Sequence, residues 1–244
     1  MLGIERTNND LIIFTLIYLS AMFPNFIGVS FIMLSTYIEL WPLFSAIGFI
    51  KKKIKILFLP FSIIFIFIFH KTISSPLMEP VISDWASFGA KSLSLDIKTS
   101  FKLNISYFVV VGTLVILTFF TLMIGSFKLD HKKKPSEFEE RLFLIGSTLY
   151  VTLYIFASNY DYKLIFLIFC IPYLSLLKNI PTKWFILLNI IVASNYFLIT
   201  YSLGDAGHYI NIISKVTIFI ILLNILIRYF IYFIKNFGIK KIFL

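Results

Sequence analysis

The sequence predicts an all-α protein, a polytopic transmembrane helical bundle of about eight spans with one long outer loop. Composition is the first observation, since 59% of the 244 residues are hydrophobic and only 14% are charged. The second is that apolar runs of about 20 residues, the length that crosses a bilayer, recur along the chain. These runs lack the alternation of barrel strands, so residues 1–244 are expected to form a single transmembrane domain.

The apolar runs predict spans at about residues 9–23, 26–50, 56–69, 105–124, 141–157, 163–177, 184–203 and 209–234. Asn8 or Asn9 is expected to cap the first helix. Glu39 and Pro42 near the middle of the second run predict a broken or kinked helix that faces protein or water. This run forms either one full span or a re-entrant pair, and only the pair would place residues 5–10 on the outer side.

The connections between the spans set the orientation. Residues 71–104 form the long outer loop, where we expect one or two short interfacial helices that either cover a site or merely connect spans. Residues 126–140 form a charged cytoplasmic linker. Thirteen lysines fall in the inner segments and five in the outer ones, which follows the positive-inside rule and places the C-terminus in the cytoplasm. The expected location is therefore the inner (plasma) membrane of a bacterium.

Charge and motif content exclude several function classes. The net charge of +10 lies in short loops between spans, which indicates contact with membrane lipid and not with nucleic acid. Cys170 is the only cysteine, so neither a disulfide nor a cysteine metal site is available. The sequence contains no nucleophile elbow or phosphate loop, which argues against a soluble hydrolase.

Residues 159–163, Asn-Tyr-Asp-Tyr-Lys, separate the fifth and sixth runs. Ionisable groups at the mouth of a membrane hairpin are costly unless they are paired or hydrated, so they suggest a functional site. The alternative is an anchor at the start of a helix, with Asn159 or Asp161 as the cap and the tyrosines in the interfacial aromatic belt.

The predicted topology collects ionisable side chains on the outer face. Such a set could bind a divalent cation or a phosphate, or supply acid and base groups, although its spacing matches no metal motif and ordinary loop polarity explains it equally. Lys215, about two turns into the eighth span, either snorkels outward or neutralises an anion. The outer-face set comprises His70, Asp84, Asp96, Asp161, Lys163, Asp205 and His208.

Three segments resemble motifs of glycosyltransferase family 87 and related membrane proteins. Residues 5–14, Glu-Arg-Thr-Asn-Asn-Asp-Leu-Ile-Ile-Phe, resemble the family's Glu-Arg-Gly-Asn-x-Asp-Leu motif. Residues 38–43, Ile-Glu-Leu-Trp-Pro-Leu, are similar to its Leu-Lys-x-Tyr-Pro-Leu segment. Residues 159–167, Asn-Tyr-Asp-Tyr-Lys-Leu-Ile-Phe-Leu, are similar to its Asn-x-Asp-Tyr-Arg-Leu-x-Phe-Leu segment. The order and spacing of the three segments match across most of the chain.

The resemblance implies a GT-C fold that moves a sugar from a polyprenyl-phosphate donor to a lipid or glycan acceptor outside the cytoplasm. The donor phosphate would need cations near the outer membrane face, and a general base would be a carboxylate or a histidine. Glu39 would be an intramembrane carboxylate. The implied donor- and phosphate-binding residues are Arg6, Asn8, Asp10, Asp161, Tyr162, Lys163 and Lys215.

The chain departs from the family pattern in ways that keep other functions open. Thr7 replaces a glycine, and Glu39 stands where the family has a basic residue. Family members carry further spans before the first motif, so this chain resembles their C-terminal part, and hexosyltransferase activity would require a separate chain that supplies those spans. A transporter or flippase of a lipid-linked or small anionic substrate is one alternative. A non-catalytic membrane partner or remnant is the other.

Overall fold

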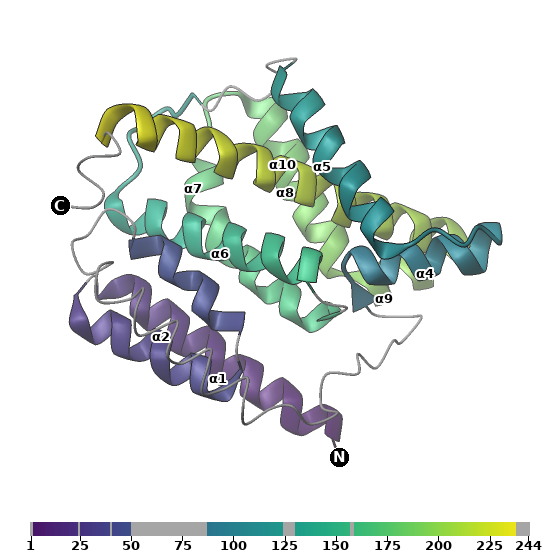
Figure 1. The fold of residues 1–244 in the computed structure, drawn as a ribbon, viewed down its shortest axis with the longest axis horizontal. Helices are drawn as coiled ribbons and strands as arrows, with labels where there is room; N and C mark the ends of the chain where they lie inside the picture. The colour runs from purple at the N-terminus through teal and green to yellow at the C-terminus, as the bar shows by residue number, and fades with distance from the viewer. Residues whose placement is uncertain are drawn as a thin grey trace.

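The structure is a computed structural model, and it describes residues 2–23, 25–39, 41–49, 87–123, 130–156 and 159–237. These residues form a bundle of helices with one antiparallel pair of two-residue strands (Figure 1). The all-α class is therefore confirmed, while the predicted span at residues 56–69 lies outside the described residues. In chain order the elements are α1 (Leu2–Met22), α2 (Phe26–Ile38), η1 (Trp41–Phe49), β1 (Ser87–Phe88), α4 (Ala90–Phe101), α5 (Tyr107–Met123), α6 (Glu137–Phe156), β2 (Asn159–Tyr160), η3 (Asp161–Cys170), α7 (Ile171–Ser175), α8 (Ile180–Ser194), α9 (Tyr196–Leu203) and α10 (Asp205–Phe237).

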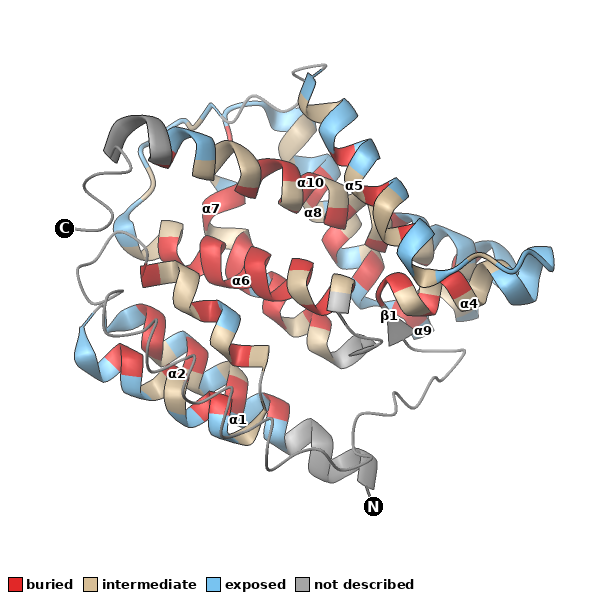
Figure 2. Ribbon diagram, in the orientation of Figure 1, coloured by how far each residue is buried: buried red, intermediate tan, exposed pale blue. Residues whose placement is uncertain are grey.

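Helix α6 is the centre of the bundle. It packs against α1, η1 and η3 on one side and against α10 on the other (Figure 1), and residues 141–150 are all buried (Figure 2). Its start is fixed by a capping box. The Ser136 hydroxyl accepts from the Glu139 amide (3.2 Å), while the Glu139 carboxylate accepts from the Ser136 amide (2.7 Å) and hydroxyl (2.8 Å).

Gly146 allows the closest contact within this centre. A Cβ atom at this position would lie 2.7 Å from the carbonyl oxygen of Phe166 and 2.8 Å from the Cβ of Phe169. Only a residue without a side chain therefore lets the backbone of η3 approach α6 this closely. Two hydrophobic clusters flank the contact, one formed with α1 and η3 and the other with α7, α8 and α10.

The second apolar run folds as a helical hairpin. Helix α2 ends at Ile38, and Glu39 after it is extended (φ −143°, ψ 148°). Helix η1 then runs back along α2 (Figure 1), so that a Cβ atom on Gly28, at the start of α2, would lie 3.0 Å from the ring of Phe49 at the end of η1. The predicted break is confirmed, and the backbone turns back on itself as the predicted pair would.

The seventh run is not a single helix, and the sequence did not predict its break. Helices α8 and α9 meet at Asn195 and are bent by 86°. Asn211 of α10 stabilises the bend, because its side-chain amide donates hydrogen bonds to the carbonyls of Val192 (2.7 Å) and Ala193 (3.1 Å). These carbonyls lie in the last turn of α8, where carbonyl groups lose their partners within the helix.

Two predicted helix boundaries are also corrected. Helix α1 continues through Asn8 and Asn9 to Leu2, so neither asparagine is its cap. The tight turn predicted over residues 204–208 consists of Gly204 alone, which has a positive φ of 58°, and α10 begins at Asp205. Glycine reaches this left-handed conformation without a steric penalty, which lets the chain reverse within one residue.

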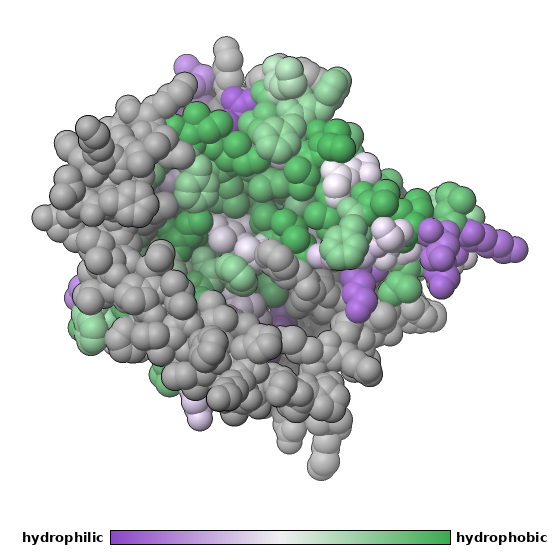
Figure 3. Space-filling view, in the orientation of Figure 1, coloured by the Kyte–Doolittle hydropathy of each residue, from purple (hydrophilic) through white to green (hydrophobic). Residues whose placement is uncertain are grey.

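Among the described helices, α10 is the one long and apolar enough to cross a membrane, over Asp205–Phe233 with a mean hydropathy of 2.3. The bent pair α8–α9 would be a second span if it crosses as one unit. Hydrophobic side chains also cover the face over α5 and α10 (Figure 3), and on α5 Phe108 is 80% and Met123 87% exposed. The eight-span bundle remains a prediction. The shorter apolar helices cover Asn9–Met22, Phe26–Ile38, Tyr107–Met123 and Lys163–Ser175.

Candidate functional site

Two distant parts of the chain meet at the C-terminal end of α6. Strand β1, from the long outer loop, pairs with β2, which opens the polar stretch 159–163. Phe88 lies opposite Asn159 in this pair. Helix α4 follows directly after β1 and confirms the expected short helix in that loop. We call this part of the molecule, residues 39, 41, 87–96, 159–163 and 205–215, the polar end.

An ion pair at the polar end joins the hairpin turn to η3. The Nζ atom of Lys163 lies 2.8 Å from Oε2 of Glu39, and the two side chains are 12% and 29% exposed. The indole of Trp41 donates to the same carboxylate oxygen, and Lys163 Nζ lies 5.1 Å from the centre of its ring. A half-buried charge thus meets both an opposite charge and an aromatic face, which offsets the loss of water around it.

This pair changes how two of the candidate residues are understood. Glu39, expected within the membrane, lies at the turn of the hairpin and contacts the first turn of η3. Its negative charge compensates the positive charge of Lys163, so Lys163 could bind a phosphate only by exchanging partners. The acid at position 39 therefore has a structural explanation in the lysine that it neutralises.

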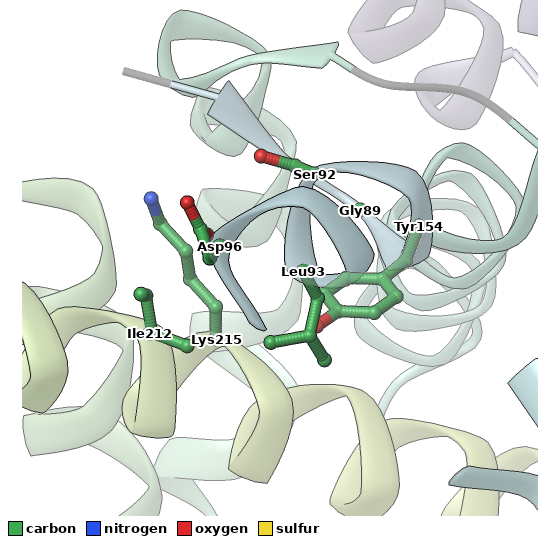
Figure 4. A pocket seen from close by; sticks show the side chains of 7 residues that line it. All are labelled: Gly89, Ser92, Leu93, Asp96, Tyr154, Ile212 and Lys215. Carbon is green, nitrogen blue, oxygen red and sulfur yellow. The ribbon is translucent and has the colours of Figure 1, made fainter. Parts of the chain in front are cut away.

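A second lysine lines a small pocket between α4, α6 and α10 (Figure 4). Lys215 is only 4% exposed, and its Nζ atom lies 5.5 Å from the centre of the Tyr196 ring. In Figure 4 the side chains of Lys215 and Asp96 extend toward the same side of the pocket. The pocket encloses about 10 Å³, room for about one water molecule, and is lined by Gly89, Ser92, Leu93, Asp96, Tyr154, Ile212 and Lys215.

Helix α6 positions Lys215 through the backbone. The hydroxyl of Tyr150 donates to the carbonyl of Lys215 (2.8 Å), and Tyr150 itself is 1% exposed. Two turns toward the start of α10, the Tyr196 hydroxyl and Nδ1 of His208 are 3.3 Å apart. The lysine is therefore held between the centre of the bundle and the α8–α9 bend.

The remaining candidates are dispersed. Asp10 is 4% exposed and shares the buried face of α1 with Ile13 and Ile17. Asp205 is exposed in the first turn of α10. Among the described residues, no group of three or more His, Cys, Asp or Glu side chains is placed to hold a metal ion. His70, Asp84 and the side chains of Arg6, Asn8, Asp161 and Tyr162 lie outside what the structure describes.

Sequence reasoning overlooked the aromatic residues of both lysine environments. Trp41 stands two positions from Glu39, and Tyr150 and Tyr154 stand four positions apart on one face of α6. This spacing in the sequence could have indicated that these aromatic residues belong to the site. Ser92 and Gly89 gave no signal of their own, because their place in the pocket depends on the β1–β2 pairing. Comparison with protein-family models, with curated proteins and with solved structures finds no match to this chain.

Proposed function

We propose that the chain is an integral membrane protein whose polar end lies at the outer surface. Three observations support this proposal. Helix α10 is long enough to cross a bilayer, and α5 exposes large apolar side chains that water would disfavour. The bent pair α8–α9 passes the same test of length and composition when it is taken as one unit.

The proposed activity is glycosyl transfer from a polyprenyl-phosphate sugar to a lipid or glycan acceptor at the polar end. The observation that carries it is the pocket that Lys215 and Asp96 line together. A buried ammonium group is a suitable partner for the donor phosphate, and a carboxylate in the same pocket could accept the proton of the acceptor hydroxyl. The pocket encloses about 10 Å³, far less than the roughly 300–1,000 Å³ of typical small-molecule sites, so its lining side chains would have to move apart to admit the reacting head group while the lipid stays in the bilayer.

The test uses the full chain reconstituted in lipid vesicles with radiolabelled polyprenyl-phosphate sugars. We expect transfer by the wild-type protein and by a Lys98→Gln control, since Lys98 is exposed on α4, two residues from Asp96. Lys215→Met and Asp96→Asn should each lower transfer by at least about 100-fold, the usual effect of losing a charge-stabilising or base group. Unchanged transfer in both variants would contradict the assignment of the pocket, and absent transfer with every donor would contradict the activity.

A transporter or flippase is the second candidate, and the two helix breaks favour it. The α2–η1 hairpin turns at Glu39 and the α8–α9 pair bends at Asn195. Discontinuous helices of this kind often form substrate sites in transporters. Movement of a fluorescent lipid-linked anion across the vesicle bilayer, without formation of a glycosylated product, would favour this candidate over transfer.

A further inference from the structure

The charged linker before α6 is attached to the turn between α7 and α8. The amide of Lys132 donates to the carbonyl of Leu176 (2.9 Å), and the amide of Lys178 donates to the carbonyl of Asp130 (2.7 Å). An isolated antiparallel bridge joins His131 to Leu177 between these two bonds. The linker is therefore held in place along this turn at the N-terminal end of α6.

The pairing gathers lysines that are far apart in the sequence. Two carboxylates near them are already engaged, because Glu139 accepts from Ser136 and Glu137 lies 3.9 Å from Arg141. Asp130 and Glu140 are the other acidic residues of this segment, so lysines outnumber the remaining acids. We call the following set the basic ribbon: Lys132, Lys133, Lys134 and Lys178, which are exposed, and Lys183, which is partly exposed.

Apolar side chains border the basic ribbon at the start of α8. Trp184 is 61%, Ile180 51% and Phe185 50% exposed. The ammonium group of Lys183 lies 5.5 Å from the centre of the Trp184 ring. An exposed tryptophan beside lysines and aliphatic side chains is typical of the boundary between lipid head groups and acyl chains.

The basic ribbon and the polar end lie at opposite ends of α6. The linker lysines of the ribbon, residues 132–134, precede Glu137, and β2 follows shortly after Phe156. About 30 Å of helix separates them, which equals the thickness of a bilayer core. If the polar end faces outward, the ribbon lies at the height of the inner head groups.

We propose that the basic ribbon is a binding surface for anionic phospholipid head groups of the inner leaflet. Clustered lysines next to a membrane segment attract acidic lipids, and Trp184 would insert beside them. The exposed apolar side chains favour a membrane over a nucleic acid, which would leave them in water. The proposal rests on the membrane location proposed above, but it does not depend on glycosyl transfer.

The test compares thermal unfolding of the full chain in detergent micelles that contain either phosphatidylglycerol or phosphatidylcholine. The altered protein carries Lys132→Gln, Lys133→Gln and Lys134→Gln. The matched control carries Lys91→Gln, Lys98→Gln and Lys102→Gln, which remove the same charge from α4 and from the residue that follows it. A third protein carries arginine at positions 132–134 and tests whether charge alone is sufficient.

We expect phosphatidylglycerol to raise the unfolding temperature of the wild-type protein, the control and the arginine protein by about 3–6 °C relative to phosphatidylcholine. The glutamine ribbon variant should lose most of this increase. Adding 0.5 M salt should reduce the increase in every protein that shows it, because salt shortens the distance over which charges attract each other (to about 3 Å at 1 M). Equal increases in the ribbon variant and the control would overturn the proposal. So would binding of a short DNA duplex without any response to lipid. A lost lipid response with intact sugar transfer would separate this proposal from the proposed activity.

Discussion

Lys163 and Glu39 are 124 positions apart in the sequence, yet Nζ of Lys163 lies 2.8 Å from Oε2 of Glu39. The pair joins the turn of the α2–η1 hairpin to the first turn of η3. Trp41 strengthens the junction, because it donates to the same carboxylate and places its ring beside the ammonium group. The polar end is therefore held together in part by a contact between the hairpin turn and the polar stretch 159–163.

Removing either charge of this pair should destabilise the protein. Glu39→Gln or Lys163→Gln leaves a half-buried charge without its partner, which we expect to cost about 1–2 kcal/mol of unfolding free energy, between the values for surface and buried pairs. Thermal unfolding in detergent should show a decrease of about 2–4 °C for each kcal/mol.

The exchanged variant Glu39→Lys/Lys163→Glu provides the stricter check. It restores opposite charges at the same two positions and should recover part of the lost stability. Asp130→Asn, which removes an exposed carboxylate elsewhere, is the control for the change in net charge that Glu39→Gln causes. Single variants that are as stable as the wild-type protein would show that the pair contributes nothing.

Gly146→Ala should be strongly unfavourable because a Cβ atom would lie 2.7 Å from the Phe166 carbonyl. The clash is with backbone, so η3 would have to move away from α6, at a cost of about 1–3 kcal/mol. Gly112→Ala is the matched control in α5, since its Cβ would meet nothing within 4 Å. We expect that change to be neutral or stabilising by up to about 1 kcal/mol, and similar unfolding temperatures for the two variants would contradict the packing.

Asn211→Leu should weaken the α8–α9 bend. The substitution removes two donated hydrogen bonds, to Val192 and Ala193, and leaves carbonyls in an apolar setting at a cost of about 1–3 kcal/mol. Asn189→Leu is the control, because the exposed amide of Asn189 bonds only to Phe185 in its own helix. Hydrogen exchange of α9 should increase in the first variant and not in the second.

The capping box of α6 predicts a dependence on pH. Hydrogen bonds from the Ser136 amide and hydroxyl lower the pKa of Glu139 below its ordinary value of 4.5. The ionised form is therefore favoured in the folded state, and its contribution is full above about pH 4.5 and is lost as the pH falls through the lowered pKa. Ser136→Ala should destabilise the protein by about 1 kcal/mol at pH 7, and the stability difference between wild type and Glu139→Gln should shrink on acidification. A constant difference from pH 7 to pH 3 would contradict this account.

Much of the local structure was predictable from the sequence. The apolar runs predicted the helices, and Glu39 with Pro42 predicted the break in the second run, because a charge and a proline are both unfavourable inside an apolar helix. The bend at Asn195 was missed since no proline or glycine marks it. It depends on Asn211, a residue of another helix whose side chain supplies hydrogen bonds across the bend.

The candidate site was predictable only in part. The outer-face set included Lys163 and Asp96, yet the pairing of Lys163 with Glu39 and the placement of Asp96 in one pocket with Lys215 depend on tertiary contacts. Helical periodicity reports which face of a helix is buried, but it carries no information about which distant segment covers that face. The two-residue β1–β2 pair, which brings α4 to the polar end, is too short to leave an alternating pattern in the sequence.

The most direct test of the central claim, that the polar end and the basic ribbon face opposite sides of a membrane, is cysteine accessibility in intact cells. Cys170 is fully buried, and Cys170→Ala removes it from the background. Ser100→Cys on exposed α4 and Lys133→Cys in the ribbon then report the two ends. We predict that a membrane-impermeant maleimide labels position 100 in intact cells and position 133 only after permeabilisation. Labelling of both positions in intact cells, or of neither, would contradict the account.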